Sequence, residues 1–391
     1  MTEKLEALKA EIRDELDGLS DDLIKLSRRI FDNPELKYEE TRAAAWLTEK
    51  LEEQDFAVER GVGGLDTAFL ARCPHGGDGP TVAFLSEYDA LPGLGHACGH
   101  NLIATIGLGA GLGLCSVMDR VGGQVLVVGT PAEEGGGGKI ELIDAGVFDE
   151  VDIAMMVHPS DRTLVGRGSL GVQELNFDFS GEAAHASSQP EEGINALDAV
   201  IATFNNANAL REHTKESSRI HGIITNGGKK PNIVPEQASA CFYVRAAELS
   251  DLEKLVEKVK NCASAGALAT GAELEITEED HAYKPMEPNP VLADLVEENF
   301  EALGEEVEDY EGGMGSTDMG DISQEIPAVH PYIRITEEDT PAHSEAFARA
   351  SNSDRGYSAM LTAAKALAMA GIDVLGNEEN YRQIMESFQE E

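Results

Sequence analysis

The sequence predicts an α/β protein whose mixed, mostly parallel sheet is sandwiched by helices and interrupted by an inserted ferredoxin-like α+β domain. Three observations support this fold class. Short apolar runs alternate with helical periods in the first part of the chain. Strand-like and helical segments then follow one another in the order β-α-β-β-α-β. The 391 residues also exceed what one hydrophobic core usually contains.

The first part of the chain begins with a predicted helix of roughly 30 residues, in which leucine and isoleucine recur at helical spacing up to Asn33-Pro34. The run at 81–86 is apolar and precedes a Gly/Pro-rich turn, as expected of a buried parallel strand. The other predicted elements are strands over 66–72, 124–130 and 153–158 and helices over 102–118 and 139–145.

The pattern changes after Gly171, where residues 172–180 alternate apolar and polar side chains like a half-exposed strand. The rest of the inserted domain consists of a helix over 195–212, strands over 220–225 and 238–246, a helix over 252–268 and a strand over 273–277. The prolines at 285, 288 and 290 mark its end. We therefore expect a discontinuous domain of residues 1–171 and 286–391, interrupted by a domain of residues 172–285.

The charge of the chain is strongly negative, with 72 acidic residues against 30 basic ones. Such a surface repels nucleic acids and anionic membranes, so no partner of either kind is expected. Hydrophobic residues make up 42 % of the chain, which excludes disorder. The acidic excess is spread along the sequence, and this distribution suggests a halophilic protein in a salt-rich cytoplasm. No transmembrane helix or signal peptide is predicted.

The five cysteines are odd in number and scattered, which does not resemble a disulfide framework. Four of them are expected to be buried small apolar residues, and a reducing cytoplasm fits best.

Potential metal ligands follow the predicted strands. Cys98 and His100 come after the strand at 81–86, Glu133 and Glu134 after 124–130, and His158 ends 153–158. The carboxyl ends of parallel strands form the ligand-binding edge of such a sheet. His343 belongs to a fourth group near the C-terminus. Imidazole, thiolate and carboxylate are the ligand types that zinc-like ions take.

The ordered motifs GHACGHN, TPAEEGGGG, MVHP, GEAAHAS, PNIVPE and AHSEAF resemble the co-catalytic metallopeptidase family of aminoacylases and dipeptidases. Within it, they look like the amidohydrolase branch of hippurate hydrolases, auxin-conjugate hydrolases and p-aminobenzoyl-glutamate hydrolase. The stretch EYDALPGLGHACGHNL is similar to the β-alanyl-lysine dipeptidase type.

This resemblance implies two divalent cations per chain, with zinc favoured and manganese, cobalt or nickel as alternatives. It implies that Cys98 bridges both ions, that His100 and His158 complete one site, and that Glu134 and His343 complete the other. Glu133 would be the general base. The implied reaction is hydrolysis of the amide bond of a small N-acyl amino acid or dipeptide.

Four further residues are candidates for supporting roles. Asp89 could orient His100, or be a turn residue before Pro92. The resemblance implies that His185, in the inserted lid domain, stabilises the oxyanion in a partner's active site across a homodimer interface. It also implies that Asn232 contacts that region or the substrate. Arg245 could clamp a substrate carboxylate or belong to a surface ion pair.

The chain departs from the wider branch at two positions where aspartate is usual, Glu87 and Asn101. Both departures match the β-alanyl-lysine-like type and bear on the substrate. Three alternatives stay open: a p-aminobenzoyl-glutamate-type hydrolase, a non-catalytic binding protein with the same fold, and a thiol hydrolase that uses Cys98 with His100.

Overall fold

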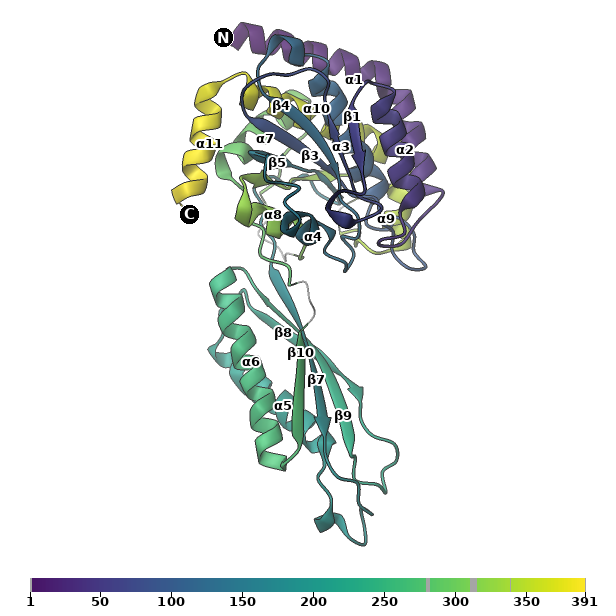
Figure 1. Cartoon of the computed structure of the whole chain (residues 1–391), viewed down its shortest axis with the longest axis vertical. Coiled ribbons are helices and arrows are strands. Elements are labelled where there is room, and N and C mark those ends of the chain that lie inside the picture. Colours follow the sequence, from purple (N-terminus) through teal and green to yellow (C-terminus); the bar gives the residue numbers. More distant parts are fainter. Residues whose placement is uncertain (1, 279–281, 310–314, 338, 391) are drawn as a thin grey trace. The chain divides into compact units, whose positions relative to one another are not determined.

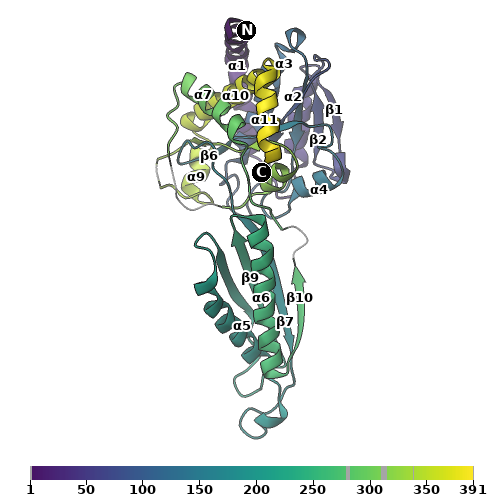
Figure 2. The ribbon, with the colours of Figure 1, turned by 90° about the vertical axis from the view of Figure 1, so that its left-hand side faces the viewer.

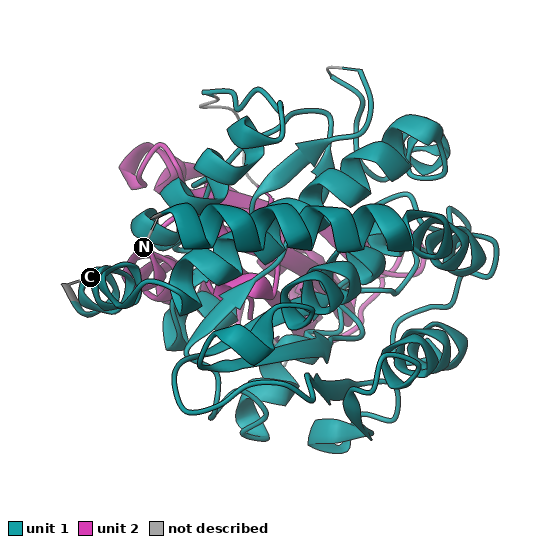
Figure 3. Cartoon of the chain, turned by 90° about the horizontal axis from the view of Figure 1, so that it is seen from above, with its two compact units in different colours: residues 1–168, 287–313, 321–391 teal, residues 169–286, 314–320 magenta. Residues whose placement is uncertain are grey.

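The computed structural model describes residues 2–278, 282–309, 315–337 and 339–390 and forms two compact units (Figure 3). The first unit contains Met1–Gly168, Glu287–Gly313 and Asp321–Glu391, and the second contains Ser169–Met286 and Met314–Gly320. The sequence prediction had left the last of these segments in the first domain. It belongs with the second unit because Leu170 N–H donates to the Gly315 carbonyl (2.8 Å) and Arg245 to the Ser316 hydroxyl (2.6 Å).

The first unit is built on a six-stranded mixed sheet in the order β1-β2-β4-β3-β5-β11. Parallel pairing joins β4 to β3, β3 to β5 and β5 to β11, while β1 and β2 pair antiparallel at one edge. The strands are β1 (Ala57–Arg60), β2 (Phe69–Arg72), β3 (Thr81–Ser86), β4 (Gln124–Gly129), β5 (Ile153–Met155) and β11 (Ala328–Val329). A small parallel pair, β6 (His158–Ser160) and β12 (Tyr332–Arg334), lies beside it.

Helix α3 (His100–Cys115) packs directly on β3 and β4 (Figure 1), among the other helices of the first unit (Figure 2). Every one of its residues is buried. Its glycines make this close approach possible. A Cβ on Gly107 would lie 2.4 Å from the Leu85 carbonyl oxygen, and one on Gly111 would lie 2.2 Å from Val127. The opposite side of α3 packs against α1 (Thr2–Phe31) and α10 (Asp354–Leu375).

The remaining helices of the first unit and its borders are α2 (Thr41–Glu52), α4 (Gly138–Asp144), α7 (Pro290–Ala302), α8 (Met319–Glu325), α9 (Glu345–Ala350) and α11 (Glu378–Glu390). Short 3₁₀ turns lie at Val62–Gly64, Met118–Arg120, Pro190–Glu192 and Arg211–His213. The sequence analysis did not identify α2 or the edge strand β1.

The second unit has an antiparallel four-stranded sheet in the order β10-β7-β9-β8. Its elements are β7 (Gly171–Ser180), α5 (Ala196–Leu210), β8 (Arg219–Asn226), β9 (Gln237–Ala246), α6 (Leu249–Thr270) and β10 (Glu273–Glu278). Both helices pack on β7 and β9 and cover a core of their own. The predicted fold class, with its mixed sheet and inserted α+β domain, is confirmed.

Two stretches, His100–Arg120 and Asp354–Leu375, are long and apolar enough to cross a membrane by composition. Within the most apolar 18 residues of each stretch, 94 % and 72 % of the residues are buried inside the first unit. Their apolar character therefore matches their place in the core of the first unit, where α3 begins the first stretch and α10 is the second.

Cys73 and Cys115 are buried as expected, but they form a disulfide, which was not expected from the sequence. The bond joins the segment after β2 to the last residue of α3, two sites that are 42 residues apart in the sequence but adjacent in the fold. Cys98, Cys241 and Cys262 are free thiols. Cys241 and Cys262 are only half-buried, so the expectation of burial was wrong for these two. The prediction of a reducing cytoplasm rested on unpaired cysteines and loses that support.

Candidate metal centre

The predicted ligands of the first unit meet beyond the carboxyl ends of its central strands. Cys98 precedes α3 by two residues, and His100 is the first residue of that helix. Glu133 and Glu134 follow β4, while His158 follows β5. His343 comes from the loop before α9, where its N–H donates to the Ala97 carbonyl (3.0 Å).

Three overlapping groups of ligand atoms form, and within each group all atoms lie within 4.8 Å of one another. One group contains Cys98, His100 and His158, and a second contains Cys98, Glu134 and His343. The third joins His100 to Glu133 and Glu134. Cys98, His100 and Glu134 each belong to two groups, and Cys98 is the one that joins the histidine pair His100 and His158 to the pair Glu134 and His343.

Buried His100 and half-buried His158 present the same ring nitrogen to this centre. His100 Nδ1 is 2.9 Å from Asp89 Oδ1, and His158 Nδ1 is 2.6 Å from the Pro159 carbonyl oxygen. An acceptor at Nδ1 fixes the tautomer with a lone pair on Nε2, which is the nitrogen that can bind a metal. The arrangement of donors therefore fits divalent cations, and these residues would hold them.

Asp89 touches two of the ligand-bearing segments at once. Its Oδ1 meets His100, and its Oδ2 accepts a hydrogen bond from the Glu134 N–H (2.9 Å). Burial opposes ionisation of Asp89, but the neighbouring His100 outweighs it and lowers the pKa of the carboxyl. Asp89 is therefore an ionised anchor for both segments and more than a turn residue.

The two adjacent glutamates are separated by the turn that carries them. Ala132 adopts a left-handed conformation (φ 62°), and its carbonyl accepts from the N–H groups of Gly136 and Gly137 (3.0 and 2.9 Å). Glu134 Oε1 lies 3.2 Å from His343 Nε2, whereas Glu133 Oε2 lies 3.9 Å from His100 Nε2. The carboxylates thus address different parts of the same centre.

The loop between α1 and α2, which was not singled out from the sequence, holds this turn in place. Buried Glu40 accepts hydrogen bonds from Ala132 N–H (3.0 Å) and the Thr67 hydroxyl (2.9 Å). Tyr38 donates its hydroxyl to the Gly136 carbonyl (2.7 Å), and Lys37 donates to that of Gly135 (2.5 Å). Glutamates are so common in this chain that the sequence alone does not distinguish Glu40 from a surface glutamate.

The thiol alternative is disfavoured by the surroundings of Cys98. Burial raises the pKa of the Cys98 thiol, whereas a thiol nucleophile needs a lowered one. The ring nitrogen at 3.4 Å from its sulfur is His158 Nε2, and burial lowers the pKa of His158 to about 4. The thiolate form of Cys98 needs additional positive charge, which a bound cation supplies.

The three predicted residues of the lid lie in the second unit. His185 and Asn232 are exposed and belong to neighbouring segments, since Ala186 N–H donates to the Asn232 carbonyl (3.1 Å). The Ser187 hydroxyl lies 3.2 Å from His185 Nδ1. Arg245 is half-buried on β9 and donates to Ser316, with its guanidinium 5.8 Å from the centre of the Tyr243 ring.

The two departures from the usual branch pattern have different surroundings. Asn101 is buried and donates to the Ser27 hydroxyl and the Ser351 carbonyl (both 3.0 Å), so it ties α3 to α1. Glu87 reaches the metal centre, with its Oε2 3.5 Å from His100 Nε2.

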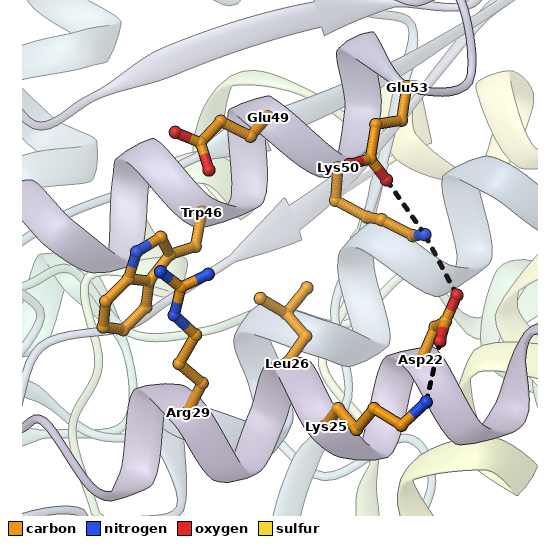
Figure 4. A pocket seen from close by; sticks show the side chains of 8 residues that line it. All are labelled: Asp22, Lys25, Leu26, Arg29, Trp46, Glu49, Lys50 and Glu53. Carbon is orange, nitrogen blue, oxygen red and sulfur yellow. Dashed lines mark hydrogen bonds and ion pairs between the residues drawn. The ribbon is translucent and has the colours of Figure 1, made fainter.

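A separate surface pocket lies between α1 and α2 (Figure 4). The Arg29 guanidinium covers the Trp46 ring at 4.0 Å, and Lys50 reaches both Asp22 (3.4 Å) and Glu53 (3.2 Å). Acidic and basic side chains pair with one another there, so the pocket is a solvated network of ion pairs beside the helix contact.

Comparisons with known proteins agree with this geometry. A profile of Peptidase family M20/M25/M40 matches residues 83–366. The chain is 42 % identical to a Xaa-Arg dipeptidase from Mus musculus, covering 95 % of this chain and 90 % of that protein. It is 35 % identical to one of the polypeptides of p-aminobenzoyl-glutamate hydrolase from Escherichia coli, covering 71 % and 62 % respectively.

Two solved structures share the fold. A putative aminohydrolase from methicillin-resistant Staphylococcus aureus superposes with a TM-score of 0.83 at 21 % identity and covers 94 % of this chain and 100 % of its own. A dinuclear metal-binding peptidase of the M20 family from Bacillus subtilis gives 0.74 at 21 % identity, covering 92 % and 99 %.

The double contact of Asp89 predicts that Asp89→Asn weakens metal binding. An asparagine can accept from His100 or from Glu134 N–H but not keep both contacts, so we expect a loss of about 10- to 100-fold in zinc affinity. Competition with a chromogenic chelator measures the loss. Asp152→Asn is a matched control, because Asp152 accepts from Thr81 N–H (2.7 Å) at the opposite end of β3. Equal affinities in both variants would contradict the role of Asp89.

Glu40 predicts a pH-dependent difference in stability. Burial raises the pKa of its carboxyl from 4.5 to about 7, and the charge of Asp89 adds to the shift. The folded chain therefore binds this proton more tightly than the unfolded chain, and stability is lost as the pH rises from about 4.5 to about 7. Glu40→Gln cannot lose the proton. Relative to the unmodified chain, its free energy of unfolding should rise over that window, by up to ~3 kcal/mol.

Urea unfolding at pH 5 and pH 8, performed on metal-free protein, measures this difference. The prediction fails if the two proteins differ in free energy of unfolding by the same amount at pH 5 and at pH 8. The Glu40 carboxyl would then titrate in its ordinary range.

Proposed function

Because the chain belongs to Peptidase family M20/M25/M40, we propose that its two-metal centre hydrolyses dipeptides with a basic C-terminal residue. Membership of this family gives the reaction class: the chain is a metal-dependent hydrolase of amide or peptide bonds, as the sequence predicted. The observation that supports the two-metal centre is the cluster itself: Cys98 groups with His100 and His158 and also with Glu134 and His343, and Glu133 groups with His100 and Glu134. The basic C-terminal residue of the substrate is proposed from the similarity to the Xaa-Arg dipeptidase.

The residues of the centre divide the chemistry among themselves. Two divalent cations bound there would lower the pKa of a water molecule and polarise the scissile carbonyl. Glu133 is the general base in this proposal: it takes the proton of the attacking water and delivers it to the leaving nitrogen. Glu134 and His343 would hold one cation, and His100 and His158 would hold the other. Zinc suits thiolate and imidazole best, and manganese, cobalt or nickel can replace it.

Arg245 is our candidate for binding the substrate carboxylate. Among the residues that the structure describes, it has no carboxylate partner, although the chain has 72 acidic residues. A half-buried guanidinium that donates to a hydroxyl and lies near an aromatic ring can still bind an anion. We further propose that His185 stabilises the developing oxyanion and that Asn232 orients the substrate.

We propose that the second unit forms a homodimer through β8. This edge strand exposes Ile223 (65 %) and Ile224 (45 %), and Ile233, in the loop between β8 and β9, is 38 % exposed. An apolar edge strand tends to pair with another strand. The opposite edge, β10, carries Glu273, Glu275 and Glu278, whose charges oppose such pairing.

The dimer predicts that Ile223→Lys shifts the chain toward monomer, because a lysine on the edge strand blocks pairing. Sedimentation equilibrium measures the change. Leu268→Lys is the matched control: Leu268 is more exposed (86 %) but lies on α6. A monomeric unmodified chain, or equal association of both variants, would contradict the β8 interface.

The charge of the chain supports two further proposals. A net charge of -42 suits a protein that stays hydrated in concentrated salt, and we propose a halophilic protein. We also propose a location in a salt-rich cytoplasm, which cell fractionation tests.

Chelation and a substrate panel test the proposed activity. The panel contains dipeptides ending in Arg or Lys, β-alanyl-lysine, N-acetyl amino acids, hippurate and p-aminobenzoyl-glutamate, each at low and high potassium chloride. We expect activity to vanish on chelation, to return with zinc or manganese, and to be highest with the basic dipeptides in high salt. Glu133→Gln should bind two ions while its kcat falls at least about 100-fold.

The outcomes separate the alternatives. Preference for p-aminobenzoyl-glutamate would replace the dipeptide proposal and keep the mechanism. Two bound ions without turnover of any substrate would support a binding protein. Turnover by the metal-free chain would exclude the two-metal mechanism and bring Cys98 forward as nucleophile. Full activity without salt would contradict the halophilic proposal.

A further inference from the structure

Glu87 directs a buried oxygen at the metal centre. It follows the last residue of β3, and its side chain is fully buried. Its Oε1 accepts a hydrogen bond from buried Lys139 (2.5 Å). Its Oε2 has no hydrogen-bond partner among the described residues and lies 3.5 Å from His100 Nε2, which also has none.

A direct hydrogen bond does not explain this pair of atoms. Asp89 holds His100 Nδ1, so the neutral ring has its lone pair on Nε2 and faces the Glu87 oxygen as a second acceptor. A doubly protonated ring would direct an N–H at Glu87, but 3.5 Å exceeds the usual N–H···O range of about 2.7–3.2 Å. Two buried acceptors facing each other without a donor cost free energy, about 1–3 kcal/mol for each unsatisfied group.

A cation between the two atoms satisfies both of them. Zinc binds imidazole nitrogen and carboxylate oxygen at about 2.0–2.2 Å, so two such ligands at a tetrahedral angle are about 3.4 Å apart. The observed separation of 3.5 Å agrees with that value. We propose that Glu87 is a further ligand of the cation that His100 and His158 hold. This inference rests on the two-metal centre of the proposed function.

Lys139 is a positioning residue in this arrangement. It is fully buried on α4 and fixes Oε1 of Glu87, which leaves Oε2 directed at His100. Its positive charge also offsets one of the carboxylates that converge on the centre.

With Glu87 as a ligand, each cation would have one carboxylate ligand, since Glu134 would serve the other cation. A mixed set of oxygen, nitrogen and sulfur donors favours harder ions such as manganese more than imidazole and thiolate alone do.

Titration of the metal-free chain of 391 residues with Co²⁺ tests the proposal without an activity assay. Visible absorption reports the ligands of cobalt, and competition with a chelator gives the affinity of each equivalent. In Glu87→Gln, which keeps an oxygen for Lys139 but removes the charge, one equivalent should bind at least about tenfold more weakly with an altered spectrum. The other equivalent should stay within about twofold of the unmodified chain.

Asp373→Asn is the matched control, because Asp373 forms a comparable ion pair with a mostly buried lysine, Lys9 (2.6 Å), away from the centre. Its cobalt affinity should not change even if its stability falls. Glu87→Asp decides the question if Glu87→Gln does not fold: it keeps the charge for Lys139 but is one methylene shorter, and it should also weaken one equivalent.

Unchanged affinity and spectrum in a folded Glu87 variant would overturn the ligand role and leave the Glu87–Lys139 pair as a structural contact. Failure of the unmodified chain to bind two equivalents of cobalt would instead contradict the two-metal centre itself, so the two proposals fail in different ways.

Discussion

The candidate metal centre depends on the Asp89 carboxylate more than on any other single group. One of its oxygens fixes the ring of His100, and the other fixes the backbone of Glu134. These two ligands come from different strand ends, and Asp89 is the buried group that joins them. An ionised carboxylate is tolerated at this buried position because each of its oxygens accepts a hydrogen bond.

The fold positions this carboxylate by bringing a helix unusually close to the sheet. Gly107 and Gly111 let α3 lie directly on β3 and β4. His100, the first residue of α3, therefore lies beside Glu87 and Asp89, which follow β3. A larger side chain at either glycine would lift the helix from the strands. The geometry of the centre therefore depends on backbone packing some distance from any ligand.

The sequence predicted those parts of the molecule that follow local patterns. β3 agrees with its predicted range of 81–86, because uninterrupted apolar runs mark buried parallel strands. The candidate ligands Cys98, His100, Glu134 and His158 come after such strands. The hydrogen bond from Ala132 N–H to Glu40 was not predictable, nor was the ion pair of Glu87 with Lys139. These contacts join residues 52 to 92 positions apart, and nothing in the spacing of common residue types indicates them.

The disulfide between Cys73 and Cys115 has a consequence for the denatured chain. The covalent ring it closes contains Glu87, Asp89, Cys98 and His100. When the protein unfolds with this bond intact, a thiol, an imidazole and two carboxylates stay within one short ring at a raised effective concentration. Such a ring can chelate a cation even without the fold, so bound metal protects the native state by less than its affinity for the folded centre alone implies.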